Sequence, residues 1–320
     1  MAKSKSPGPN GEVVRDGNTF VVRTLGSNWM VKRVEENKMP GVEPEGEPGV
    51  GNVYRKVFRN KRIYLPDEYE RAYSEVMDGK DVVPIGMNGY SNLDDLPWDE
   101  WNIPGGGAQY LESSRGCFDE VIEMIESDFD RVDVVVSHGA SDTGIDLMLQ
   151  EACRDYKLAN LGHSCPGYMM YVLDDDGAVY VGTDKVQYAD MFINSCRILV
   201  SANGKEQAFQ HDYKATFEGV KRTRPDGTTY VHRPKLVLAN IIRAISTNGG
   251  GPPGIDKDGK VIDATAAFEE LFFAQQNPRI VGTGRTSWDD LVGHVTGSIK
   301  FITRSLVTPS RAYRKHRRTG

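Results

Sequence analysis

The sequence predicts an α/β protein with a Rossmann-like, mostly parallel sheet flanked by helices, an extended N-terminal arm and a C-terminal helix with a basic tail. Two observations predict this class. Short apolar runs alternate with segments of helical periodicity between residues 53 and 299. These runs lack the polar alternation of half-exposed strands, which is typical of strands buried on both faces of a parallel sheet. We expect an arm or linker over 1–52, the α/β domain over 53–299 and the tail over 300–320.

The central unit of the predicted domain spans 131–167. It begins with the β-branched run from Val132 to Val136, which predicts a buried strand. A loop from Ser137 to Gly144 follows and opens directly into a helix, because one apolar stripe has helical spacing. In open α/β sheets such junctions lie at the carboxyl edge, where ligands bind. The stripe consists of Ile145, Met148, Leu149, Ala152 and Tyr156.

The other elements of the domain follow from the same two periodicities. The Asp176-Gly177 pair is a turn signal and predicts a hairpin over 171–181. The segment 235–245 is apolar and ambiguous between strand and helix. Further strands are expected over 82–87, 196–201 and 279–282, and further helices over 66–77, from Ser113 or Ser114, after 202–207, over 264–274 and from about 287.

Residues 1–52 do not have the pattern of a compact domain. They contain eight glycines and five prolines, and 41–49 is a low-complexity acidic linker. A short alternating piece from Thr19 to Thr24 predicts an edge strand or one arm of a hairpin. We expect this segment to bury no core of its own, and to be either disordered or an arm that orders on a partner.

Charge is distributed unevenly along the chain. The net charge is −6, but 300–320 contains seven Lys or Arg residues and no acid, which leaves 32 basic against 45 acidic residues elsewhere. A basic tail beside an acidic body predicts an anionic partner, either a neighbouring subunit or a nucleic acid. We therefore expect a homo-oligomer or a larger assembly, and a solvated end is the alternative.

Signals for membranes, metals and cofactors are missing from the sequence. No window approaches the roughly 20 apolar residues of a membrane span, and the N-terminus has no apolar signal segment. The four cysteines form no CxxC pair, which indicates free thiols in a reducing, cytoplasmic location. His138 and His163 lack a second pair of zinc ligands. We expect no metal and no cofactor.

Two strand–loop–helix junctions supply the candidate ligand site. Free N–H groups at helix N-termini favour anions, so we expect the phosphate or ribose of a ligand there. The alternative is that the glycines shape a tight turn and that Ser141 or Asp142 caps the helix. The expected ligand-binding residues are Gly139, Ser141, Asp142, Thr143, Gly144 and Asp146 from the first junction, and Asn203 and Gly204 from the second.

The order of these junctions resembles the SLOG superfamily. The resemblance rests on SHGASDTGIDLMLQEA, NLGHSCPG and the ANGKEQAF stretch before a helix, and it covers about 81–221. That group includes LOG-type nucleotide phosphoribohydrolases and domains that sense nucleotide-derived signals. The resemblance implies a Rossmann-like fold and a nucleotide-derived ligand held by the glycine-rich turn.

The chain departs from the hydrolases of that superfamily at their catalytic motif. They carry Pro-Gly-Gly-x-Gly-Thr-x-x-Glu, whereas 201–207 here has one glycine, no Pro-Gly-Gly and no Gly-Thr. Glu206 is the candidate catalytic residue, as a general acid or base. It is equally the acid that a first helical turn favours. Whether the protein is an enzyme stays open at this point.

Three functions are consistent with these patterns. The first is binding of a nucleotide or a nucleotide-derived ligand by a SLOG-like domain within an oligomer. The second is a structural or assembly protein, for instance a virion protein, whose arms bind neighbours. The third is an N-glycosidic hydrolase or transferase. An intact pocket favours ligand binding, and a crevice filled by the protein's own side chains favours the scaffold.

Overall fold

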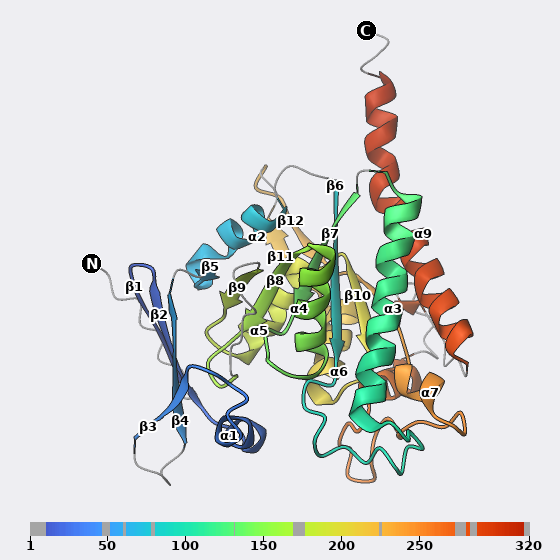
Figure 1. Ribbon diagram of the computed structural model, residues 1–320. Coiled ribbons are helices and arrows are strands. Elements are labelled where there is room, and N and C mark those ends of the chain that lie inside the picture. The colour runs from blue at the N-terminus through green and yellow to red at the C-terminus, as the bar shows by residue number, and fades with distance from the viewer. Residues whose placement is uncertain are drawn as a thin grey trace.

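The computed structural model describes residues 11–46, 52–59, 62–77, 81–130, 132–168, 177–223, 226–272, 280–281 and 287–316. In this part of the chain, helices flank both faces of an eight-stranded sheet, and a four-stranded antiparallel sheet lies beside it (Figure 1). A separate ribbon pairs β11 (Val220–Thr223) with β12 (Thr229–His232). The predicted α/β, Rossmann-like class is confirmed.

The eight-stranded sheet is parallel throughout. Its strands are β5 (Arg62–Tyr64), β6 (Asp81–Gly89), β7 (Val132–His138), β8 (Ala159–Ser164), β9 (Gly177–Val181), β10 (Ile198–Ala202), β13 (Lys235–Leu238) and β14 (Ile280–Val281). They lie in the order β14-β13-β10-β6-β7-β8-β9-β5. The chain adds β7 to β9 on one side of β6 and later adds β10, β13 and β14 on the other. The boundary between β6 and β10 is therefore a topological switch point, the usual place for a ligand in open α/β sheets.

Two groups of helices cover the two faces. Around one face lie α3 (Gly106–Asp128), α4 (Gly144–Tyr156), α7 (Ile241–Ile245) and α9 (Trp288–His316). Against the other lie α2 (Tyr69–Met77), α5 (Lys185–Ser195), α6 (Glu206–Tyr213) and α8 (Ala264–Phe272). The short turns η1 (Pro66–Glu68) and η2 (Lys214–Glu218) precede α2 and follow α6.

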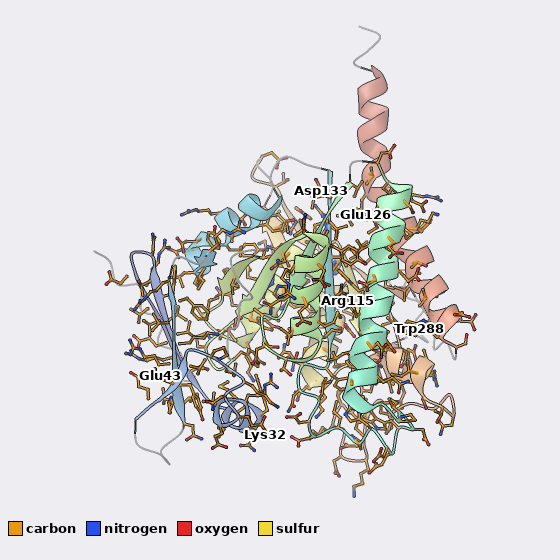
Figure 2. All side chains as sticks on the ribbon, in the orientation of Figure 1. Lys32, Glu43, Arg115, Glu126, Asp133 and Trp288 are labelled. Atoms are coloured by element: carbon orange, nitrogen blue, oxygen red, sulfur yellow. The ribbon has the colours of Figure 1, made fainter. Side chains whose placement is uncertain are left out.

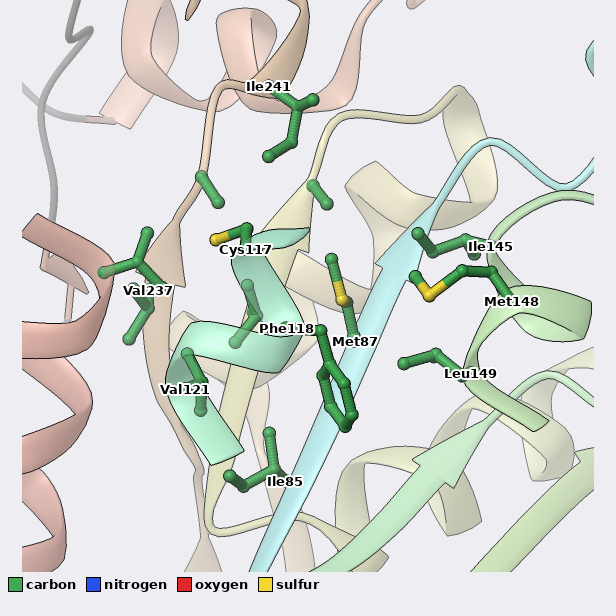
Figure 3. Packing of buried hydrophobic residues seen from close by; sticks show 14 of the residues in the cluster. Ile85, Met87, Cys117, Phe118, Val121, Ile145, Met148, Leu149, Val237 and Ile241 are labelled. Carbon is green, nitrogen blue, oxygen red and sulfur yellow. The ribbon is translucent and has the colours of Figure 1, made fainter. Parts of the chain in front are cut away.

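The sheet is buried on both faces because successive side chains of a strand point to opposite sides. In β10, Ile198 and Val200 pack toward α3, whereas Leu199 packs with residues of α5 and α8. Figure 3 shows the first cluster, in which Phe118 of α3 and Leu149 of α4 flank β6. This arrangement explains why the strand segments of the sequence are apolar without alternation.

The expectation that the N-terminal segment buries no core is wrong for its described residues. They form β1 (Gly11–Asp16), β2 (Thr19–Leu25) and β3 (Val42–Glu45), which pair into one sheet with β4 (Val53–Arg59) from the range predicted for the α/β domain, and α1 (Asn28–Glu35) packs on this sheet through Met30. The predicted strand at Thr19 is confirmed as one arm of the β1–β2 hairpin, and β2 lies inside the order β1-β2-β4-β3 and not at an edge. The prediction failed because a small sheet forms a core when only the alternate, inward residues of its strands are apolar, as Phe20 and Val22 are here. Its glycines, such as Gly17, occupy the turns between strands.

This small sheet shares apolar contacts with the large one. Phe20 and Val22 of β2 belong to the same buried cluster as Val179 and Val181 of β9. Polar contacts add to this, since Lys32 of α1, which is labelled in Figure 2, donates a hydrogen bond to Asp94 at 3.1 Å. The N-terminal segment is thus packed against the body.

The structure corrects two local predictions and resolves one segment that the sequence left ambiguous. The helix expected from Ser113 or Ser114 begins at Gly106 after the N-cap Gly105, and Ser114 is fully buried within it. The expected hairpin is wrong because β9 pairs in parallel with both of its neighbours, β8 and β5. The first arm of that hairpin, 171–176, lies outside the described residues. The ambiguous segment 235–245 contains both a strand, β13, and a helix, α7.

The C-terminal helix α9 packs on the body with one stripe and then extends past it (Figure 1). Leu291, Val295 and Ile299 are fully buried in the large core, and Lys300 forms an ion pair with Asp128 of α3. The expected basic tail is therefore helical as far as His316. Among the described residues, no helix combines the length and apolarity needed to span a membrane.

Candidate functional site

The loops after β6, β7 and β10 meet at the switch point. The loop after β6 leads to α3 on one face, and the loop after β10 leads to α6 on the other. The loop between β7 and α4 carries most of the predicted ligand residues. The structure therefore brings the two predicted junctions to the same edge of the sheet.

Asp146 occupies the position expected for a ligand anion. Its Oδ1 accepts from the backbone N–H of Gly139 at 2.7 Å. Its Oδ2 accepts from the hydroxyls of Ser141 at 2.7 Å and Ser91 at 2.9 Å. The carboxylate is 7% exposed and lies in the first turn of α4, where the helix dipole favours negative charge. The loop thus supplies its own anion.

Gly144 is fixed by packing against the loop after β6. Its φ is +59°, and an added Cβ would lie 2.3 Å from the Tyr90 carbonyl oxygen. That carbonyl accepts from the N–H of Ile145 at 3.0 Å. The N-cap of α4 is Thr143 without a side-chain cap bond, so neither Ser141 nor Asp142 caps the helix.

Asp142 faces the N-terminal sheet and not the switch point. Its carboxylate lies 3.5 Å from the guanidinium of Arg33 in α1, and it is 2% exposed. Burial raises the pKa of Asp142, and the Arg33 charge opposes that rise. The residue joins the two sheets.

The second junction is locked into a buried polar network. The Asn203 side chain donates to Asp263 at 3.0 Å and to Asn240 at 3.0 Å, and it accepts from the N–H of Ile242 at 2.9 Å. Burial raises the pKa of Asp263 to about 6. Gly204 has φ +122°, and its carbonyl accepts from the N–H of Ala264. Asn203 and Gly204 thus connect the loop after β10 to the segment after β13 and to the start of α8.

Tyr90 fills the crevice on the α3 side. Its hydroxyl donates to Asp263 at 2.8 Å, and its N–H donates to the hydroxyl of Tyr110 at 3.1 Å. The ring packs edge-on or tilted against Trp98, Trp101 and Tyr110. This side of the switch point is closed by the protein's own side chains.

A pocket of about 70 Å³ remains on the α5 and α6 side. Of the predicted residues, Gly139 and Asp146 line it. Sequence reasoning missed its other polar residues, because three of them come from helices whose rotation depends on packing and two come from β6 and the loop after it. The one available signal was the i, i+4 spacing of Gln207 and His211. The missed polar residues are Asn88, Ser91, Tyr188, Gln207 and His211.

The polar groups of this pocket are one carboxylate and several neutral donors and acceptors. Burial lowers the pKa of His211 to about 3, so its ring is neutral. Gln207 bonds His211 at 3.2 Å and accepts from the hydroxyl of Tyr168 at 3.1 Å. Without a cation in the described lining, the pocket favours hydroxyl or amino donors over a phosphate.

Glu206 lies apart from this pocket. It is exposed at the first residue of α6, and its only described bond is from Gln210 at 3.4 Å. Among the described residues, no group of three or more His, Cys, Asp or Glu side chains is arranged to hold a metal ion.

Comparisons with known proteins show only a distant structural likeness. No family model matches the chain, and no curated protein matches it. A solved structure described as the X-ray structure of TM1055, a structural genomics target, matches with a TM-score of 0.32 and 14% identity. The match covers 49% of this chain and 74% of that one.

Proposed function

We propose that the protein binds a nucleotide-derived ligand at the switch-point pocket, and that hydroxyl or amino groups of the ligand donate to Asp146. The supporting observation is a buried carboxylate that lines a pocket at the carboxyl edge of β6 and β7. A carboxylate near such an edge is suited to a ribose diol. We expect any phosphate group of the ligand to lie outside this pocket, away from the negative charge of Asp146.

The pocket's size limits what it holds. Pockets for whole drug-sized ligands measure about 300–1,000 Å³, against about 70 Å³ here. We therefore expect one polar part of the ligand to enter, beside Gln207 and Ser91, while the rest extends past Tyr168. The SLOG resemblance of the sequence favours a nucleoside-derived molecule for this role.

We favour a function in which the protein binds its ligand without cleaving an N-glycosidic bond. Glu206 is exposed and does not line the pocket, and the hydrolase motif is degraded. Asp146 already accepts three hydrogen bonds, which holds it as a fixed acceptor. Chromatography of incubated nucleoside monophosphates should therefore show no free base.

The test is calorimetry with a panel of ribonucleosides, nucleotides and their 2′-deoxy analogues. Asp146→Asn turns one acceptor oxygen into a donor, so binding should weaken by at least about tenfold, as for a lost hydrogen bond to a charged group. Asp155→Asn is the matched control, since Asp155 lies half-exposed at the far end of α4. Binding that is equal in both variants, or absent across the panel, would contradict the proposal.

A second candidate is an assembly role through α9. Phe301 is 75% exposed on this helix and Leu306 is also exposed, and the sequence from Arg304 to His316 is basic. The closed crevice around Tyr90 is consistent with such a scaffold. The partner we propose is a second copy of this acidic chain.

A further inference from the structure

A larger cavity lies away from the switch point, at the carboxyl end of β13. It measures about 490 Å³, within the range of small-molecule sites. Its walls come from α7, α8 and the Gly-Pro-Pro-Gly turn between them. The residues that matter below are Asn240, Arg243, Pro253, Gly254 and Glu269.

The turn that forms one wall is held rigidly. The carbonyl of Gly254 accepts from the N–H groups of Ile262 at 2.9 Å and Asp263 at 3.3 Å. An added Cβ at Gly254 would lie 2.4 Å from the backbone nitrogen of Ala267 in α8. The proline at 253 adds an exposed ring with no N–H donor. The cavity thus has a fixed, partly apolar wall.

Donors face this cavity from α7 and its cap. Asn240 is 4% exposed, and its side-chain oxygen accepts from Arg243 N–H and from Asn203. Within the described residues, its amide nitrogen donates to no acceptor. The Arg243 guanidinium is half-exposed, and Glu269 at 3.8 Å is its nearest described charge. Unused N–H groups are therefore directed at the space between α7 and α8.

An acceptor faces the same space from α8. The Glu269 side chain is 16% exposed, and one of its oxygens, Oε1, is buried without a hydrogen-bond partner in the described residues. Burial raises the pKa of Glu269 to about 7. At 3.8 Å the pair between Arg243 and Glu269 Oε2 is too long for a direct hydrogen bond, so the guanidinium and Oε2 have capacity for a ligand.

We propose that this cavity binds a guanine-type base, whose adjacent acceptors and N–H donors match the Arg243, Asn240 and Glu269 side chains. Arginine donates in bidentate fashion to O6 and N7 of guanine. The N1–H and amino groups of the same base are donors that a carboxylate accepts. The proline turn gives the flat face of the base an apolar wall. This site is separate from the switch-point pocket and does not depend on Asp146.

Titration calorimetry of the full chain with guanosine, adenosine and inosine tests this proposal. Guanosine should bind saturably, and adenosine at least about tenfold more weakly because its edge reverses the donor and acceptor pattern. Inosine lacks the amino group and should be intermediate. Arg243→Met and Glu269→Gln should each weaken guanosine binding at least about tenfold.

The matched control is Arg154→Met, which removes an arginine whose nearest carboxylate, Asp155, is also 3.8 Å away. This variant should leave guanosine binding unchanged, and urea unfolding should confirm that every variant is folded. Absence of guanosine binding to the wild type, or equal binding of adenosine, would overturn the assignment. Guanosine binding that is lost in Asp146→Asn but kept in Arg243→Met would also overturn it, and would instead support the switch-point pocket.

Discussion

Buried ionisable side chains give this protein a specific dependence of stability on pH. His163 is fully buried between Tyr180 and Phe192, and burial lowers its pKa to about 3. The unfolded chain takes up this proton near pH 6.5, so stability is complete above that pH. Below it, the free energy of unfolding falls by about 1.4 kcal/mol per pH unit until about pH 3.

Asp212 acts in the opposite direction. It accepts from Ser201 and Asn88 in the core, and burial raises its pKa to about 7. The folded state therefore holds a proton that the unfolded chain loses near pH 4, and the contribution to stability falls as the pH rises toward about 7. Urea unfolding between pH 4.5 and 6.5 gives the free energy of unfolding as a function of pH. Relative to the wild type, the slope of this dependence should fall by about 1.4 kcal/mol per pH unit in His163→Leu and rise by about the same amount in Asp212→Asn. Parallel curves for both variants and the wild type would contradict these two assignments.

Residue types alone predicted only part of the candidate site. Asp146 and Gly139 line the pocket as expected, because a strand–loop–helix junction fixes where they lie. Asn203 and Asp142 were expected there too, but their side chains form buried contacts with residues distant in sequence. Such contacts depend on how loops meet, which no local pattern contains.

At the scale of elements, the contact between α4 and the loop after β6 is the tightest feature near the site. We expect Gly144→Ala to lower the free energy of unfolding by more than about 2 kcal/mol, because a positive φ alone costs about 1–2 kcal/mol. The overlap with the Tyr90 carbonyl adds to this cost. Gly144 variants therefore report on folding as well as binding.

Gly293→Ala is the matched control for that prediction. It lies inside α9 with no atom near the position of an added Cβ. Alanine should stabilise this helix by about 0.5–1 kcal/mol. Urea unfolding of both variants checks the pair, and equal effects would mean that the close approach at Gly144 is relieved at little cost.

Elements with strong periodicity were predictable, and elements made of mixed residues were not. The strands β6, β7 and β10 and the helix α4 follow from apolar runs or one clear stripe. Apart from β2, the small antiparallel sheet was missed because its strands carry charged outward residues, such as Arg23 and Glu45, which pair with each other across the sheet. Pairing between strands gives such segments a stability that their composition does not indicate.

At the scale of the whole molecule, the end of α9 is the feature most directly related to assembly. We expect the full chain to self-associate at low salt and to dissociate as salt rises, since exposed charges are screened over about 8 Å at physiological ionic strength. Sedimentation should show this for the full chain and not for a chain ending at Arg304. Phe301→Ser should weaken association, and Val186→Ser, which alters another exposed apolar residue on α5, should not. Monomeric behaviour of the full chain at every salt concentration would exclude this role.

The order of strands also has a consequence for biosynthesis. β5 belongs to the N-terminal part of the chain, yet its partner in the sheet is β9, with Arg62 opposite Ala178. The apolar faces that contain Phe20, Phe58 and Ile63 are likewise covered by Val179 and Val181. At a ribosomal speed of about 5–20 residues per second, the gap between the two strands lasts on the order of ten seconds. During that interval the nascent chain presents the apolar surface of its N-terminal sheet uncovered, because the residues of β9 that cover it have not yet been synthesised.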